Sequence, residues 1–177
     1  PGRFRFHADR DSYDYIYQIE DLAQLQGRKF QKKRNHANRF QQEHPDWQVL
    51  PLDEQTRVGA FCLLQSWYAN RAQLDPLTDF HLEKLALERA FAFQKQLDME
   101  GIVLVEKGQV LAFAMGSRLN ADTFDIHFEK AREDIQGAYT IINREFARYL
   151  QAKYPEVKWL NREDDMGLEG LRTAKLS

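Results

Sequence analysis

The stretch Thr123–Lys130, T-F-D-I-H-F-E-K, gathers side chains that acid–base and group-transfer chemistry require. His127, Glu129 and Lys130 lie close together in it, and a second polar run, Asn161–Asp165, follows a short apolar segment. A carboxylate would act as a base, a hydrogen-bond acceptor or a ligand for an ammonium group, and a lysine or arginine would stabilise an oxyanion. The catalytic candidates are therefore Glu129, Lys130, Glu163 and Asp164.

The elements around these candidates predict that they meet. Thr123–Lys130 alternates as a strand would, with an apolar face of Phe124, Ile126 and Phe128 and an ionisable face of Asp125, His127 and Glu129. Gly137–Lys153 carries apolar residues at helical spacing, and Val157–Leu160 is a second short strand. If both strands share a sheet they are parallel, so their carboxyl ends lie at one edge, where open α/β sheets bind ligands.

The rest of the chain predicts helices followed by an antiparallel meander. The expected elements are a strand at Ser12–Ile19, a helical region Glu20–His44 interrupted at Gly27, helices Asp53–Arg71 and Thr78–Leu97, and a hairpin of Gly101–Glu106 with Gln109–Gly116. Pro1–Arg10 is compatible with an edge strand. The buried side of the Asp53–Arg71 helix is predicted to hold Val58, Phe61, Leu64 or Gln65, and Tyr68, with Cys62 buried beside them.

Composition limits the class of protein. The 177 residues are 43% hydrophobic and 29% charged, as in an ordinary globular protein with one core. No apolar run approaches the roughly 20 residues that span a bilayer, and no signal-peptide pattern opens the sequence. The single cysteine, Cys62, excludes an internal disulfide and favours a reducing compartment, so we expect a cytoplasmic protein.

Basic residues are concentrated in Arg28–Arg39, although the net charge is only −2, and no acid occurs from Gln24 through Gln42. The absence of acids for i,i+4 pairs favours an anionic partner, which would be tRNA or a lipid headgroup at the inner membrane face. The residues assigned to this partner are Lys32, Lys33 and Arg39. A solvated helix face is the alternative, and Arg34 and Asn35 would in another arrangement point inward.

Four segments are similar to the family of the C-terminal domain of phosphatidylglycerol lysyltransferases and its stand-alone relatives. They are K-K-R-N-H-A-N-R-F (32–40), H-F-E-K-A (127–131), I-N-R-E-F-A (142–147) and N-R-E-D-D-M-G-L-E-G-L-R-T-A-K-L-S (161–177). The resemblance covers roughly Tyr13–Ser177. It implies an α/β (α+β) GNAT-like acyltransferase fold, a mixed sheet flanked by helices, within a tandem GNAT-like arrangement. Residues 1–98 would end the first half and carry the basic helix, and 99–177 would form a C-terminally incomplete core.

The resemblance implies an acyltransferase. Characterised lysyl- and alanyl-phosphatidylglycerol synthases move an aminoacyl group from tRNA to a lipid hydroxyl, so we expect aminoacyl transfer to a lipid hydroxyl or a small amine or hydroxyl acceptor. An acyl-CoA-dependent N-acetyltransferase is one alternative, but Arg132–Ala138 has one glycine and two acids where a pyrophosphate would bind. A non-catalytic RNA- or anionic-membrane-binding module is the other. No cofactor other than the acyl donor is expected.

Further polar residues are candidates for substrate binding, and each also has a structural interpretation. They are Arg34, Asn35, His127, Asn143, Asn161, Arg162, Arg172 and Lys175. Asn143 would equally be a buried anchor between helix and sheet, and Arg172 with Lys175 a solvated helix end. Asp165 would cap the last helix. No metal site is predicted, because no third ligand stands at a recognisable spacing from His127 and its neighbouring carboxylate.

Overall fold

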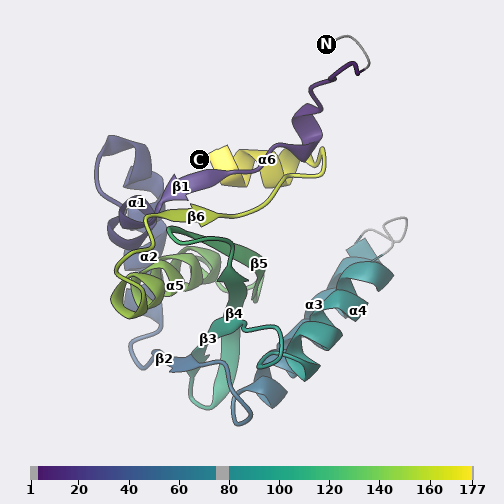
Figure 1. Cartoon of the computed structure of the whole chain (residues 1–177). Coiled ribbons are helices and arrows are strands. Elements are labelled where there is room, and N and C mark those ends of the chain that lie inside the picture. Colours follow the sequence, from purple (N-terminus) through teal and green to yellow (C-terminus); the bar gives the residue numbers. More distant parts are fainter. Residues whose placement is uncertain (1–3, 75–79, 177) are drawn as a thin grey trace.

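The computed structural model describes residues 4–74 and 80–176 and shows one mixed sheet between two layers of helices (Figure 1). The strands, in spatial order, are β1 (Ile16–Gln18), β6 (Trp159–Asn161), β5 (Thr123–Ala131), β4 (Gln109–Arg118), β3 (Glu100–Glu106) and β2 (Gln48–Pro51). Only β5 and β6 pair in parallel. The predicted meander, crossover helix and parallel strand are therefore confirmed.

Helices cover the two faces of the sheet with separate apolar cores. One face carries α1 (Ile19–Gln24), α2 (Gln31–Glu43) and α5 (Ala138–Lys153), and the other carries α3 (Arg57–Leu74) and α4 (His81–Ala92), which Figure 1 shows on the far side of β4 from α5. Short 3-10 turns at Arg10–Ser12 and Arg28–Phe30 and a final helix, α6 (Glu169–Leu176), complete the chain. Phe124 and Phe146 centre the first core, and Phe113 and Leu87 the second.

A bulge in β5 decides which side chains face which layer. Met115 pairs with Phe128 and Gly116 with Ile126, so His127 is the extra residue between them. Phe124 and Ile126 consequently pack in the α5 core, whereas Phe128 packs against the α3–α4 core. The prediction of three apolar residues on one face was wrong at Phe128, because simple alternation stops at the bulge.

The strands β5 and β6 separate after a short contact. Their parallel pairing ends at Asp125 and Asn161, although β5 continues to Ala131. Between them, α5 starts at Gly137, whose φ of +90° lies in the left-handed region. A Cβ on Gly137 would stand 2.5 Å from the carbonyl oxygen of His36, so α2 crosses close to the first turn of α5.

Several predicted details differ in the structure. Residues 4–9 form no strand, and the strand expected over Ser12–Ile19 is limited to β1. In α3 the buried side is turned by about one residue: Ala60, Leu63 and Leu64 are buried, whereas Val58, Phe61 and Cys62 are exposed. The reason is that α3 packs on both β4 and α4. The expected helix start at Thr78 lies outside the described residues.

Two further predictions concern membrane-spanning helices and the division of the chain into two parts. Among the described helices, none is long and apolar enough to cross a bilayer. The sheet takes β1 and β2 from residues 1–98 and its other strands from residues 99–177, and the division of the chain near residue 98 stays a prediction.

Candidate functional site

The carboxyl ends of β5 and β6 meet through Glu129 and Arg162. Arg162 donates from Nη2 to Oε2 of Glu129 over 2.9 Å and from Nε to the same oxygen over 3.0 Å, and Asn143 on α5 donates Nδ2 to it at 3.3 Å. The Glu129 side chain is only 10% exposed. Its other oxygen, Oε1, is buried and has no hydrogen-bond partner among the described residues. A buried carboxylate oxygen in this state lacks the donor that such atoms usually have.

Two further side chains shape the surroundings of Glu129. The Tyr17 ring lies under the guanidinium of Arg162, 5.7 Å from ring centroid to Cζ. Lys33 on α2 is half-buried, and its pKa is lowered by burial and by the charge of Arg162, while the charge of Glu129 acts in the opposite direction. The charges of Glu129 and Arg162 therefore act on the ammonium group of Lys33, so α2 supplies a cation near the carboxyl ends of β5 and β6.

The turn after β6 is held rigidly from the last helix. Glu163 has a φ of +55°, and Oδ1 of Asn161 accepts its backbone N–H at 2.9 Å. Lys175 is buried and donates Nζ to the carbonyls of Arg162 and Glu163, at 2.5 and 3.2 Å, and to that of Asp164. Burial lowers the pKa of Lys175. The predicted anion ligand Lys175 thus already binds the chain's own carbonyl groups.

Arg172 likewise binds carboxylates of the chain itself. It donates Nε to Oδ2 of Asp165 at 2.7 Å and Nη2 to Oδ1 at 2.8 Å, and also reaches Asp11. Asp165 is fully buried and accepts a further hydrogen bond from the Tyr15 hydroxyl at 2.6 Å. These contacts hold its pKa well below the ordinary value.

The side chain of Asn161 donates Nδ2 to Asp14 at 2.9 Å. Asp164, a catalytic candidate, is half-buried on the same turn.

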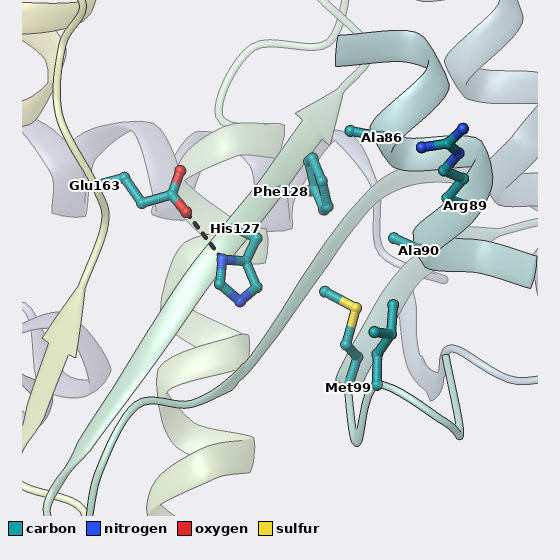
Figure 2. Close-up of a pocket in the computed structure, with 8 residues that line it drawn as sticks. Ala86, Arg89, Ala90, Met99, His127, Phe128 and Glu163 are labelled. Atoms are coloured by element: carbon teal, nitrogen blue, oxygen red, sulfur yellow. Dashed lines mark hydrogen bonds and ion pairs between the residues drawn. The ribbon is translucent and has the colours of Figure 1, made fainter. Parts of the chain in front are cut away.

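His127 and Glu163 meet on the opposite face of β5. Nδ1 of His127 lies 2.9 Å from Oε1 of Glu163, and Nε2 lies 2.9 Å from Oγ of Ser117 on β4. The bond to Glu163 raises the pKa of His127. Both residues line a groove of about 320 Å³ whose other wall includes Ala90 and Met99 (Figure 2).

Lys130 does not join Glu129, because neighbouring residues of a strand point to opposite faces. Its Nζ donates to Oε1 of Glu83 on α4 at 2.6 Å and lies 3.8 Å from the ring centroid of Trp67 on α3. The side chain is buried, and burial lowers its pKa. Lys130 therefore connects β5 to the α3–α4 pair, on the far side of the sheet from Arg162.

The basic helix is less free than its sequence indicates. Arg34 donates to the carbonyls of Leu25 and Gly27 at 2.5 and 2.6 Å and so closes the turn between α1 and α2. Arg39 forms an i,i+4 ion pair with Glu43 at 2.7 Å, which the expectation of an unpaired block had overlooked. Asn35 is exposed and accepts a hydrogen bond from Gln31 at 3.2 Å, and Lys32 is exposed.

Sequence reasoning missed several partners in this region, namely Tyr15, Tyr17, Ser117, Asp125 and Asp165. Tyr17 belongs to β1 and Tyr15 immediately precedes it, and β1 joins β6 at the sheet edge from the other end of the chain. Only the alternation of Tyr13, Tyr15 and Tyr17 gave a signal, and it predicted a strand without naming its neighbour.

Comparison with known proteins gives these residues a family. The family model described as phosphatidylglycerol lysyltransferase, C-terminal, matches residues 2–177. A conserved protein of unknown function from Bacteroides thetaiotaomicron is 41% identical, with a TM-score of 0.89 over 99% of this chain and 58% of that chain. An uncharacterized protein of Mycoplasmoides gallisepticum is 25% identical over 94% of this chain and 52% of its own length.

The fold is also shared with a more distant structure. The C-terminal domain of a putative lysylphosphatidylglycerol synthetase from Agrobacterium fabrum is 12% identical, with a TM-score of 0.56 over 86% of this chain and 46% of that chain. This likeness and the sheet order confirm the predicted mixed sheet flanked by helices. The chain spans about half the length of each of these relatives. By its match over nearly the whole sequence, the chain belongs to the phosphatidylglycerol lysyltransferase C-terminal family.

Proposed function

We propose that the protein is an acyltransferase that moves an aminoacyl group from aminoacyl-tRNA to a lipid hydroxyl, or to a small amine or hydroxyl acceptor. Family membership and a GNAT-like fold support the transferase class. The observation that carries the proposal is the buried, unpartnered Oε1 of Glu129 beside Arg162. An aminoacyl ester differs from other acyl donors by its α-ammonium group, which is the ligand that such an oxygen accepts.

The reaction needs few protein groups, because the aminoacyl ester is already activated. In the proposed site, Glu129 holds the α-ammonium, and Arg162 with Lys33 stabilises the oxyanion that forms when the acceptor attacks the ester carbonyl. A bond forms from the acceptor oxygen or nitrogen to the carbonyl carbon, and the bond to the ribose oxygen breaks. Asp164 is the proposed base that takes the acceptor's proton, which ends on the departing ribose oxygen.

The start of α5 argues against acyl-CoA as the donor. A CoA pyrophosphate would require free N–H groups there, but Gly137 is packed against the backbone of His36. In the preceding loop, Asp134 is paired with Arg132 at 2.6 Å and Glu133 with Arg71, so the local arginines are already bound to carboxylates. These two arginines are therefore less available to an anion at this position.

The partner of the basic helix follows from the same proposal. Lys32 is exposed on α2, Lys33 is half-buried on the same helix, and Arg28 is exposed before the helix. This surface would neutralise tRNA phosphates near the acceptor end, or lipid headgroups if the acceptor is a membrane lipid. We propose a cytoplasmic protein in contact with the inner membrane face in the second case.

A donor assay tests the proposal. The protein is incubated with a mixed pool of radiolabelled aminoacyl-tRNAs and, separately, with labelled acetyl-CoA, and label is followed into lipid, peptide and small-amine fractions. We expect label from tRNA, and its loss with Glu129→Gln. Glu106→Gln is the matched control, since Glu106 is a carboxylate of β3 that pairs with His44.

The other outcomes would each replace the proposal. Label from acetyl-CoA alone would establish an N-acetyltransferase. Label from neither donor, together with tRNA or vesicle binding that depends on Lys32 and Lys33, would establish a binding module.

A further inference from the structure

Three potential metal ligands converge on the face of β5 that points away from Glu129. Asp125 and His127 lie two residues apart on the strand, and Glu163 reaches them from the turn after β6. One ligand atom from each lies within 4.8 Å of the other two. Glu163 lies 36 residues from His127 in the sequence, so spacing along the chain did not indicate it as the third ligand.

We propose that Asp125, His127 and Glu163 bind one divalent transition-metal ion of the Zn²⁺ class. One imidazole nitrogen and two carboxylates form a donor set that suits zinc and its first-row neighbours. The proposal concerns a site separate from Glu129 and does not depend on the identity of the acyl donor.

The spacing of the donors fits such an ion. Nδ1 of His127 lies 2.9 Å from Oε1 of Glu163 and 3.9 Å from Oδ2 of Asp125. Ligands about 2.0–2.1 Å from a tetrahedral zinc ion stand about 3.3 Å from one another, midway between these two distances. Small side-chain rotations would therefore admit the ion without movement of the backbone.

The second ring nitrogen of His127 is held in the way that metal-binding histidines require. Oγ of Ser117 lies 2.9 Å from Nε2, so a proton on Nε2 would be donated to the serine. Nδ1 donates its proton to Glu163, and a bound ion would take the place of that proton between the ring and the two carboxylates. An outer partner of this kind fixes both the tautomer and the ring orientation of a metal ligand.

The charge balance of the cluster calls for a cation. In the described ranges, neither Asp125 nor Glu163 has an ion pair with a lysine or arginine side chain, and the histidine is their shared partner. Oδ1 of Asp125 is buried and has no hydrogen-bond partner in the part of the chain that the structure describes. Glu129, in contrast, has Arg162.

Three protein ligands leave a coordination position open, as in catalytic rather than closed structural zinc sites. His127 and Glu163 both line the groove of about 320 Å³ between β5 and α4, with Phe128 beside them and Ala90 and Met99 opposite (Figure 2). The open position would therefore accept water or a donor atom of a small ligand that enters this largely apolar groove.

Calorimetric titration of the full chain with Zn²⁺, after treatment with a chelator, tests the proposal. We expect one saturable equivalent, at least about tenfold weaker binding in Asp125→Asn and Glu163→Gln, and loss of binding in His127→Gln. The matched control is His44→Gln. His44 is also paired with a carboxylate, Glu106 at 2.7 Å, but belongs to no three-ligand group in the described structure, so its variant should bind Zn²⁺ as the unaltered protein does.

Two results would overturn the proposal. One is the absence of saturable binding by the unaltered protein, and the other is equal binding by His127→Gln and His44→Gln. Should a variant lose its fold, the Co²⁺ absorption spectrum of the unaltered protein decides the question. Ligand-field bands of one bound Co²⁺ that Zn²⁺ displaces support the site, and a spectrum identical to that of aqueous Co²⁺ contradicts it.

Discussion

Two carboxylates near the end of β6, those of Asp165 and Glu129, differ in how many of their oxygens accept hydrogen bonds. Asp165 accepts hydrogen bonds from Tyr15, from Arg172 on both oxygens and from the Gly167 backbone, the last at 3.0 Å. Glu129 accepts from Asn143 and Arg162 on Oε2, and its Oε1 has no partner among residues 4–74 and 80–176. A saturated carboxylate fixes architecture, whereas a buried acceptor left open costs about 1–3 kcal/mol. We interpret the open oxygen as a binding group and the saturated one as structural.

The largest expected effect is a loss of activity, with a smaller loss of stability, when Glu129 is replaced. Glu129→Gln should lower kcat/KM for aminoacyl transfer by about 100-fold or more, because the amide cannot pair with an ammonium group. The midpoint of thermal unfolding should fall by less than in Asp165→Asn, because Arg162 loses its charged partner but Glu129 has fewer hydrogen bonds to lose, so turnover is compared below that transition. Steady-state kinetics and circular dichroism measure the two quantities. Unchanged turnover would show that the active site lies elsewhere.

Asp165→Asn should show the reverse pattern. Removing one member of a buried, fully hydrogen-bonded ion pair leaves Arg172 without compensation, so the thermal midpoint should fall by about 10 °C. Below the transition, the folded variant should still transfer at a rate within about threefold of the original. The expectation fails if the midpoint does not move, because Asp165 would then not hold the turn.

Lys32 and Lys33 of α2 are neighbours in the sequence but differ in burial, so their substitutions should have different effects on KM. Lys33→Met should raise KM about tenfold, because its half-buried ammonium lies in the field of Glu129 and Arg162. Lys32→Met should change KM less than about twofold at physiological salt, since Lys32 is exposed and its charge is screened. Equal effects of the two substitutions would mean that α2 acts as a general basic surface.

The smallest effect concerns pH and a third carboxylate, Glu100, which is saturated at the other end of the sheet. It accepts from Lys153 and Tyr154 at 2.6 Å each and from Tyr149 at 2.7 Å. Burial alone would raise the pKa of Glu100, but these hydrogen bonds outweigh burial and hold it below its ordinary value.

A folded-state pKa below the unfolded-state pKa gives stability that is present above the unfolded value and is lost as pH falls through the folded value. The unaltered protein should therefore lose stability as the pH falls below about 4.3. Glu100→Gln should be less stable at neutral pH and should lose less of its remaining stability on acidification. Urea unfolding at pH 7 and pH 3.5 measures this, and parallel losses in both proteins would refute it.

The order of elements followed from periodicity. The continuous apolar runs of β3 and β4, the alternation in β5, the helical stripe of α5 and the Lys107–Gly108 turn each have a local physical signature, so the meander and the crossover could be predicted. The bulge at His127 could not, because one extra residue in a strand has no compositional signal. It placed Phe128 on the other face and separated Glu129 from Asp125 and His127.

The position of the candidate site at the edge of the sheet could be predicted from the sequence. The contacts between its side chains could not. The rule that parallel strands end at one edge correctly brought Glu129 to Arg162. The roles of Arg172 and Lys175 depend on Asp165 and on backbone carbonyls, which only the completed turn presents to them. Tyr17 and Asp125 become neighbours of the site through long-range strand pairing, which no single segment encodes.

Binding of a non-hydrolysable donor analogue tests the central claim most directly. An adenosine that carries an aminoacyl group through an amide at the 3′ position is compared, by calorimetry, with the same compound lacking the α-amino group. The unaltered protein should bind the amino form at least about tenfold more tightly, and Glu129→Gln should bind both forms alike. A preference for the amino form that persists in Glu129→Gln would show that the open oxygen of Glu129 does not receive the donor's ammonium group.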